Sequence, residues 1–157
     1  FIITLGLNEC WEFVPDGSVL ARNPRNRVIQ SMLKSRVLTV EENVANVQRF
    51  IDIVRENNPE FTLLISVSPV PLMATTRAHD THVIAANAHS KAVLRVAAEI
   101  LVANNRDVHY FPSYEVVTTC SDTPWKEDQR HVSPQAVQQV MRLFDAMYVV
   151  EKDVVVR

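Results

Sequence analysis

Three short apolar runs, each followed along the chain by a segment with helical character, constrain the fold more than any other feature. The runs cover residues 1–7, 61–70 and 108–117 and are rich in aliphatic and aromatic residues, as strands of a sheet are. The first two are apolar almost throughout, which predicts central strands of a parallel sheet, buried on both faces. Pro112 predicts a bend or a sheet edge within the third.

The segments between and after the runs carry the signals of helices. A helix is predicted over 39–57, because its first residue and Glu42 have the spacing of a capping box and an apolar stripe follows. A second is predicted over 84–104, and Ser133 followed by Pro134 predicts the start of a third. The apolar stripe of the third helix consists of Val137, Val140, Met141, Phe144 and Tyr148. This alternation predicts an α/β domain with a mostly parallel sheet covered by helices on both faces.

Two parts of the chain fit the alternation less well. Residues 10–34 contain the turn signal Pro15-Asp16-Gly17-Ser18 but no long periodic segment, so we predict a loop excursion that could include a short hairpin. The sequence also begins at Phe1, inside an apolar run rather than before it. We therefore expect residues 1–157 to be a single domain that lacks its N-terminal part.

Composition narrows the classes of partner. The 157 residues are 47% apolar and 22% charged, with a net charge of −2 and no block of like charge, so nucleic acid is not expected as the main partner. No run of about 18 uncharged apolar residues is present, which predicts no membrane span. The two cysteines are too few for a disulfide framework and lack zinc-ligand spacing, which favours a reducing compartment such as the cytoplasm.

The stretch from Trp125 to Pro134 holds the best candidates for chemistry. Asp128 precedes His131 by three residues, so its carboxylate could accept a hydrogen bond from one ring nitrogen and leave the other free as a general base. Asn8 follows the first predicted strand, and the carboxyl ends of parallel strands share one edge of a sheet. Its amide could donate to an oxyanion there. The alternatives are a surface Asp–His contact and an Asn that caps a turn.

Further candidates surround this edge. The Ser68-Pro69 turn after the second strand is stiff and would make a good pocket wall. Trp125 could stack on a sugar, as could Tyr110 and Tyr114, although packing is at least as common for aromatic residues beside a sheet. A His-Asp-Thr-His run at 79–82 raises the alternative of metal-assisted hydrolysis through His79 and His82. No fourth ligand or second shell can be assigned, so we expect neither a metal nor a cofactor.

Five short motifs add a resemblance to a known family. They are Gly6-Leu7-Asn8-Glu9-Cys10-Trp11, Ser68-Pro69-Val70-Pro71-Leu72-Met73, Ala86-Asn87 with Ser90-Lys91, Tyr110-Phe111-Pro112-Ser113-Tyr114-Glu115 and Asp128-Gln129-Arg130-His131. On these motifs the chain resembles the GSCFA family, which is related to the SGNH (GDSL-like) hydrolases. The resemblance implies a flavodoxin-like three-layer α/β/α fold. It also implies that Asn8 contributes to an oxyanion hole, that Glu9 stands where relatives often have Asp, and that Asp128 and His131 are the acid and base of a triad.

The sequence departs from that family in two respects. The glycine block that supplies another oxyanion donor in the family is absent, and so is the nucleophile motif. The sequence contains no Gly-Ser-Cys-Phe-Ala motif, where the nucleophilic serine is expected, and Ser18 and Ser68 lack the strand-to-tight-turn context that exposes a nucleophile. Two hypotheses follow. One is a serine-dependent esterase or acyltransferase that acts on an acyl or acetyl ester of a small molecule or carbohydrate, with Glu9, Ser68 and Trp125 at the substrate. The other is a non-catalytic binding or scaffold domain on the same fold. In either case we expect the 157 residues alone to be inactive.

Overall fold

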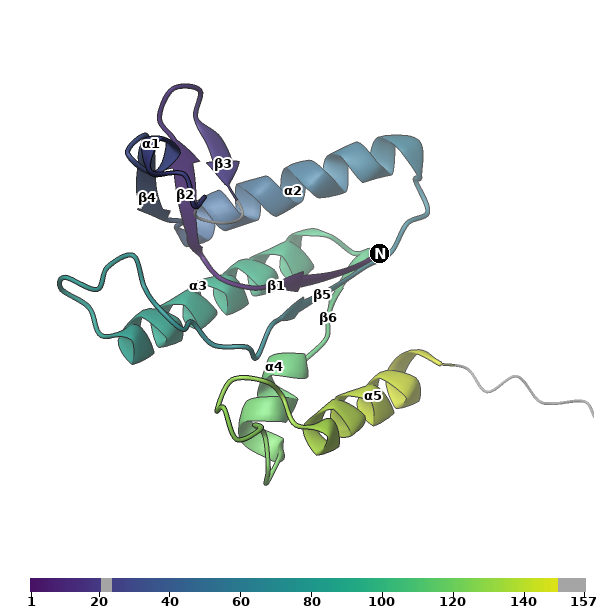
Figure 1. Ribbon diagram of the computed structural model, residues 1–157. Coiled ribbons are helices and arrows are strands. Elements are labelled where there is room, and N and C mark those ends of the chain that lie inside the picture. The colour runs from purple at the N-terminus through teal and green to yellow at the C-terminus, as the bar shows by residue number, and fades with distance from the viewer. Residues whose placement is uncertain (21–23, 150–157) are drawn as a thin grey trace, which may run out of the picture.

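A three-stranded parallel sheet forms the centre of the computed structural model, which describes residues 1–20 and 24–149 (Figure 1). The strands β1 (Ile2–Leu5), β5 (Leu63–Val67) and β6 (Val108–Tyr110) lie in the order β1-β5-β6. All five residues of β5 are buried, which confirms the second predicted strand as a central one. Because β5 has a neighbour on each side and helices over its faces, a continuous apolar run is required there.

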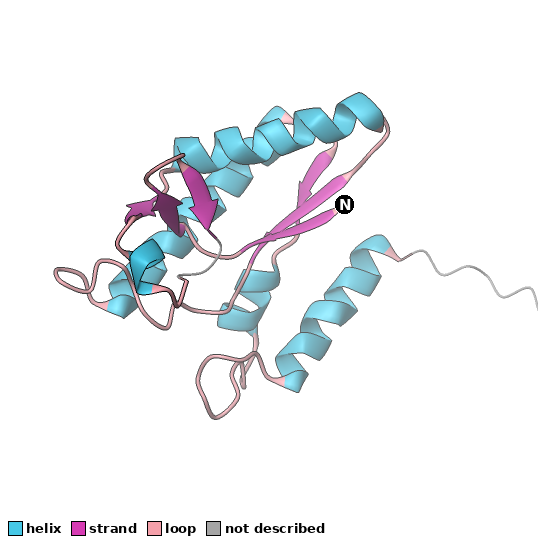
Figure 2. Ribbon diagram, turned by 45° about the horizontal axis from the view of Figure 1, so that its top comes forward, coloured by secondary structure: helices cyan, strands magenta, loops and turns pink. Residues whose placement is uncertain are grey.

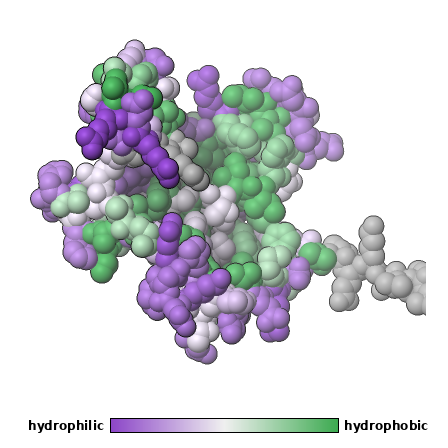
Figure 3. Space-filling view, viewed as in Figure 1, coloured by the Kyte–Doolittle hydropathy of each residue, from purple (hydrophilic) through white to green (hydrophobic). Residues whose placement is uncertain are grey.

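The first strand does not have the central position that its sequence predicts. Within the described residues β1 pairs only with β5, with Ile2 opposite Leu64 and Leu5 opposite Val67. Phe1 and Ile2 are 60% and 66% exposed. Figure 3 shows this strand as hydrophobic surface near the middle of the molecule.

Two long helices cover one face of the sheet and a third covers the other, so the fold has three layers (Figures 1 and 2). Helix α2 (Val40–Asn57) packs against α3 (Val83–Asn104) on one face, and α5 (Pro134–Tyr148) lies on the opposite side. All three predicted helices are confirmed to within a residue or two. None of the described helices is long and apolar enough to cross a membrane.

The main core lies between the sheet and the two-helix layer. Its buried members are Ile51, Phe61, Leu63, Ile65, Ala98, Leu101 and Val108. Val44, Val47 and Val54, on the apolar stripe of α2, pack against it. On α5, Phe144 and Tyr148 pack on Phe111, with ring centroids 5.7 and 6.1 Å apart, whereas Val137 and Met141 are about half exposed.

The third predicted strand is wrong beyond Tyr110. Residues after it form a short helix α4 (Ser113–Glu115) and then a π-helical turn η1 (Val116–Cys120). The ring of Phe111 contacts α5, so the chain leaves the sheet at this point instead of extending along β5. Tertiary packing therefore overrides the strand preference of this β-branched and aromatic segment.

The predicted excursion folds into a second sheet. Strands β2 (Glu9–Phe13), β3 (Ser18–Leu20) and β4 (Leu33–Val37) are antiparallel in the order β3-β2-β4, and a short helix α1 (Arg27–Gln30) precedes β4. The predicted hairpin is confirmed as β2–β3, with Gly17 at a φ of 73° in its turn. The third strand corrects the prediction of a loop.

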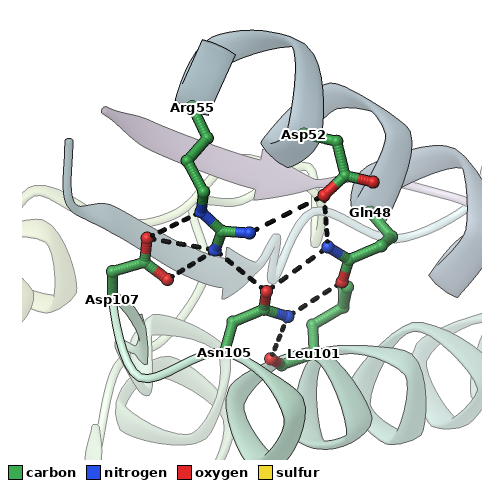
Figure 4. A network of polar contacts seen from close by, with 6 residues as sticks. All are labelled: Gln48, Asp52, Arg55, Leu101, Asn105 and Asp107. Atoms are coloured by element: carbon green, nitrogen blue, oxygen red, sulfur yellow. Dashed lines mark hydrogen bonds and ion pairs between the residues drawn. The ribbon is translucent and has the colours of Figure 1, made fainter. Parts of the chain in front are cut away.

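A network of polar side chains ties α2 to α3 and to the start of β6 (Figure 4). Arg55 on α2 donates to both carboxylate oxygens of Asp107, at 2.7 and 3.0 Å, and to Asn105 Oδ1 at 3.0 Å. Asn105 and Gln48 exchange side-chain hydrogen bonds of 2.8 and 3.3 Å. These groups are paired with one another, which indicates a structural clamp at the amino-terminal edge of the parallel strands.

Candidate active site at the carboxyl ends of the parallel strands

The predicted acid–base stretch forms a tight hairpin-like loop before α5. Trp125 and Val132 form an isolated antiparallel bridge, and the Lys126 N–H donates to the carbonyl of His131 at 2.8 Å. Gln129 lies at the tip with a φ of 53°, the left-handed region that a non-glycine residue enters mainly in tight turns. This turn is what brings Asp128 and His131 together.

Asp128 holds His131 in the way its sequence spacing predicts. One carboxylate oxygen contacts the Nδ1 of His131, and the other accepts the backbone N–H groups of Arg130 and His131 at 3.0 and 2.9 Å. Hydrogen bonds from the His131 ring and from these two amides hold the pKa of Asp128 far below its usual range. The carboxylate is therefore ionised, and it fixes the orientation of the imidazole. No hydrogen bond from the described residues reaches the Nε2 of His131.

The loop is fastened to α5 by Ser133, which is almost fully buried. Its hydroxyl accepts the N–H of Ala136 at 3.1 Å as the predicted cap and donates to the carbonyl of Thr123, while its own N–H donates to Pro124 at 2.9 Å. Pro134 occupies the first turn of the helix, as predicted. The side chains of Asp128 and His131 are exposed, but the hydrogen bonds of Ser133 hold the segment that carries them against α5.

An open hollow of about 750 Å³ adjoins the pair, lined by Trp125, Asp128, Ser133 and Pro134 among others. Its size suits a small ligand. The predicted stacking residue Trp125 is half-buried at this hollow. Tyr110 is placed differently, since the Arg95 guanidinium covers its ring at 4.1 Å from the centroid. A larger hollow at the other edge of the sheet contains Arg55 and Asp107, whose charges already pair with each other.

Asn8 follows β1 and is completely buried. Its backbone N–H donates to Ser90 Oγ at 2.9 Å, and its side-chain Nδ2 donates to the carbonyl of Leu38 at 3.1 Å. The side-chain oxygen has no hydrogen-bond partner among the described residues. Figures 1 and 2 show the segment before α5 at the same end of the sheet as the carboxyl ends of β1 and β5. No hydrogen bond joins Asn8 to Asp128 or His131 in the described part of the chain.

Glu9 connects the start of β2 to the loop after β5. Its side chain is 5% exposed, and its carboxylate accepts the Thr75 hydroxyl at 2.6 Å and the N–H and hydroxyl of Thr76 at 2.8 and 3.0 Å. Burial raises the pKa of Glu9, but these hydrogen bonds outweigh it and leave the pKa below its usual value. Both oxygens are occupied by protein donors. Ser68, the third predicted substrate residue, accepts the N–H of Val70 at 3.2 Å and so stiffens its own turn.

Residues 1–144 match the GSCFA family. The chain belongs to the GSCFA family. No curated protein and no solved structure matches it. The family resemblance drawn from five sequence motifs is thus confirmed over most of the chain.

The GSCFA chain also contains a polar cluster that residue-by-residue reasoning missed. Lys91 of α3 is 2% exposed, and its Nζ donates to the carbonyls of Gly6 and Val70, each at 2.8 Å. Burial lowers its pKa to about 8. The N–H of Leu72 donates to the Oδ1 of Asn87 at 3.0 Å. The available signal was a set of polar residues at positions 87, 90 and 91, which share one face of the predicted helix.

The His-Asp-Thr-His run of this GSCFA chain has structural partners. His79 lies 3.5 Å from the Asp80 carboxylate on the surface. His82 caps α3, because its Nδ1 accepts the N–H of Ile84 at 3.3 Å. Within residues 1–20 and 24–149 no group of three His, Cys, Asp or Glu side chains is arranged to hold a metal ion.

Proposed function

We propose that this GSCFA chain carries the acid–base half of a serine-dependent esterase or acyltransferase site of the SGNH type. The substrate would be an acyl or acetyl ester of a small molecule or carbohydrate. The observation that supports this most is the contact between Asp128 and the Nδ1 of His131, which leaves Nε2 as an oriented and accessible base. Such a pair can activate a serine hydroxyl near neutral pH by taking its proton.

The proposed reaction has two steps, acylation of the serine and deacylation, and in each of them His131 first accepts a proton and then returns it. The Nε2 of His131 takes the serine proton while the serine oxygen attacks the ester carbonyl and forms a tetrahedral oxyanion. The imidazolium, stabilised by the Asp128 carboxylate, then returns the proton to the leaving alkoxide as the ester C–O bond breaks. Water or an acceptor hydroxyl repeats the sequence on the acyl-serine, which gives hydrolysis or acyl transfer.

Asn8 would donate to the oxyanion through its side-chain amide. An amide nitrogen carries two hydrogens, and in the structure Leu38 accepts from this nitrogen. The second hydrogen is the one the proposal assigns to the developing negative charge. Glu9 and Ser68 would shape the same edge by fixing the loop after β5, and Trp125 would form a wall for the alcohol or sugar part of the ester.

The 157 residues contain no Gly-Ser-Cys-Phe-Ala motif. Ser18 donates its backbone N–H to Asp16 in the β2–β3 turn, and Ser68 accepts from Val70. Neither serine hydrogen-bonds to His131. The proposal therefore assigns the attacking hydroxyl to the serine of a Gly-Ser-Cys-Phe-Ala motif and concerns a protein that carries it.

The test is His131→Ala in the full-length protein, with turnover of p-nitrophenyl acetate as the measurement. General base catalysis contributes about 100-fold or more, so a loss of at least that size in kcat is expected. His109→Ala is a matched control, because His109 is an exposed histidine on β6. Unchanged turnover in His131→Ala would remove this residue from the reaction and the proposal with it.

The second candidate is a non-catalytic binding domain that uses the hollow beside Trp125. It is favoured by one observation: no hydroxyl or thiol of the described residues hydrogen-bonds to the His131 ring. A fluorophosphonate probe separates the two candidates, because it labels an activated serine covalently. Labelling of the full-length protein that disappears in His131→Ala supports the enzyme, whereas no labelling supports the binding domain.

A further inference from the structure

Three polar side chains of α3 point at the segments that leave the parallel sheet. Asn87, Ser90 and Lys91 are three and four residues apart, so they lie on one face of the helix. Ser90 and Lys91 are buried, at 0% and 2% exposed. Burying polar groups has a cost unless each of them finds a partner.

Each of the three side chains finds its partner in the backbone beyond a strand end. Lys91 donates to the carbonyls of Gly6, which follows β1, and of Val70, which lies three residues after β5, each at 2.8 Å. One ammonium group thus connects the exits of two adjacent strands. Because the same Nζ donates to both carbonyl oxygens, it limits how far the two segments can move apart.

The other two side chains accept one backbone N–H from each segment. Ser90 Oγ accepts the N–H of Asn8 at 2.9 Å, and Asn87 Oδ1 accepts the N–H of Leu72 at 3.0 Å. These amides lie beyond the strands, where no sheet neighbour is available to them. Each strand exit is therefore held by one acceptor of its own and by the shared ammonium.

The ammonium has no carboxylate partner among the described residues, and its only hydrogen bonds are those to the two carbonyls. A buried charge without a counter-charge is unfavourable for stability. An apolar side chain at this position would avoid that cost but could not satisfy two carbonyls from different strands. Burial alone also accounts for the lowered pKa of Lys91. Positioning, rather than stability, explains a lysine here.

We propose that Asn87, Ser90 and Lys91 form a brace that positions the strand exits of the site, with Lys91 as the positioning residue that sets Asn8 against the loop after β5. The catalytic consequence rests on the proposed function, whereas the brace itself does not. Asn8 is held at both of its backbone groups, by Ser90 at its N–H and by Leu38 at its carbonyl, at 2.9 and 2.8 Å. Loss of the brace should misplace its side chain without removing it.

The test compares Lys91→Met with Lys34→Met, a control at an exposed lysine of β4. Methionine keeps an unbranched stem of similar length but donates nothing. Hydrogen exchange of single amides is followed by NMR. We expect the Asn8 and Leu72 amides to exchange at least 10-fold faster in Lys91→Met, while the β5 amides keep their wild-type rates and Lys34→Met changes neither.

Ser90→Ala is a second, milder variant. It removes the acceptor of Asn8 only, so faster exchange is expected at Asn8 and not at Leu72. Unchanged exchange at Asn8 and Leu72 in both variants would overturn the brace. Acceleration of equal size in the β5 amides would also overturn it, because it would indicate general destabilisation rather than loss of a local constraint.

Ester turnover gives the catalytic readout in the full-length protein. We expect Lys91→Met to lower kcat at least 10-fold with KM within 2-fold of wild type, because oxyanion placement acts on the transition state. Faster exchange with unchanged kcat in an active enzyme would overturn the positioning role. If the wild-type protein turns over no ester, the proposed function fails, and the exchange rates still decide whether the brace exists.

Discussion

Glu9 and Thr76 are joined by two hydrogen bonds to the same carboxylate oxygen, 2.8 Å from the backbone N–H and 3.0 Å from the hydroxyl. They connect the start of the antiparallel sheet to the loop after β5. Arg77 lies next to this contact, with Nε 3.6 Å from Glu9 Oε1. The stability of that loop therefore depends on one buried carboxylate.

Glu9→Gln should release the loop around Thr76. The amide places an N–H₂ group where the carboxylate received donors, so at least one buried donor loses its partner, at a cost of about 1–3 kcal/mol. Trypsin cleavage after Arg77 measures the release and should become faster. Glu12→Gln is the control, because Glu12 lies on the same strand and pairs with Arg36 instead. Unchanged cleavage at Arg77 would show that the loop is held by other contacts.

The contribution of Glu9 to stability should be lost at acid pH. Its pKa in the folded state lies below the usual value because of the hydrogen bonds from Thr75 and Thr76. A carboxyl with a lowered folded pKa stabilises the fold above the pKa of the unfolded chain, and that contribution disappears as pH falls through the folded pKa. Urea unfolding from pH 7 down to pH 3 should show a smaller fall for Glu9→Gln than for the wild type.

The contribution of Lys91 to stability should rise at alkaline pH. Its pKa is about 8 in the folded protein, against 10.5 for an ordinary lysine. Between these values the unfolded chain binds more protons, so the contribution of Lys91 to the free energy of unfolding rises with pH, by about 3 kcal/mol at most. Urea unfolding from pH 7 to pH 10 should show the free energy of unfolding of the wild type rising relative to that of Lys91→Met. A constant difference would contradict the lowered pKa.

Asp128→Asn should change the tautomer of His131. An asparagine amide can donate to Nδ1, which favours the proton on Nε2 and removes the base from the accessible nitrogen. The ¹⁵N chemical shifts of the His131 ring measure this change independently of activity. In the proposed enzyme kcat should fall at least about 100-fold. Asp122→Asn, at an exposed aspartate of the same loop, should alter neither quantity.

Thr39→Ala should destabilise the start of α2. The Thr39 hydroxyl accepts the N–H of Glu42 at 3.2 Å, and the Glu42 carboxylate accepts the N–H of Thr39 at 2.9 Å. Loss of this cap should lower the free energy of unfolding by about 1 kcal/mol, whereas Thr39→Ser should retain most of it. Equal values for the two variants in urea unfolding would argue against the cap.

The helices could be predicted because their signals are local. The capping box at Thr39 and the Ser133-Pro134 start depend on neighbours three residues away, and both are confirmed. Strand β5 could also be predicted, because burial on both faces leaves a run that is apolar except for Ser66.

The remaining errors and omissions have long-range causes. The chain leaves the sheet at Pro112, which the sequence marks as a bend, but the packing of Phe111 on α5 joins residues more than 30 positions apart and has no local signal. Strand β4 exists because it pairs with β2 from Glu9 to Phe13, across a stretch with no continuous pattern. In the site, the spacing of three residues predicts the Asp128–His131 contact, and the turn at Gln129 closes it. The partners of Lys91 lie 85 and 21 positions away, and no local pattern specifies them.

The segment that forms the antiparallel sheet leaves the rest of the fold at Asn8 and returns to it at Leu38, and these two residues are hydrogen-bonded to each other. The N–H of Leu38 donates to the carbonyl of Asn8 at 2.8 Å, and the Asn8 side chain donates back to Leu38 at 3.1 Å, so the chain returns to where it left. The geometry of β1 and α2 therefore sets no requirement on how many residues lie between β2 and β4. Closing a longer loop at a fixed neck costs little extra entropy. The tip of this excursion is accordingly the place where an inserted reporter peptide, or a segment of different length in a relative, can be accommodated without moving the parallel sheet.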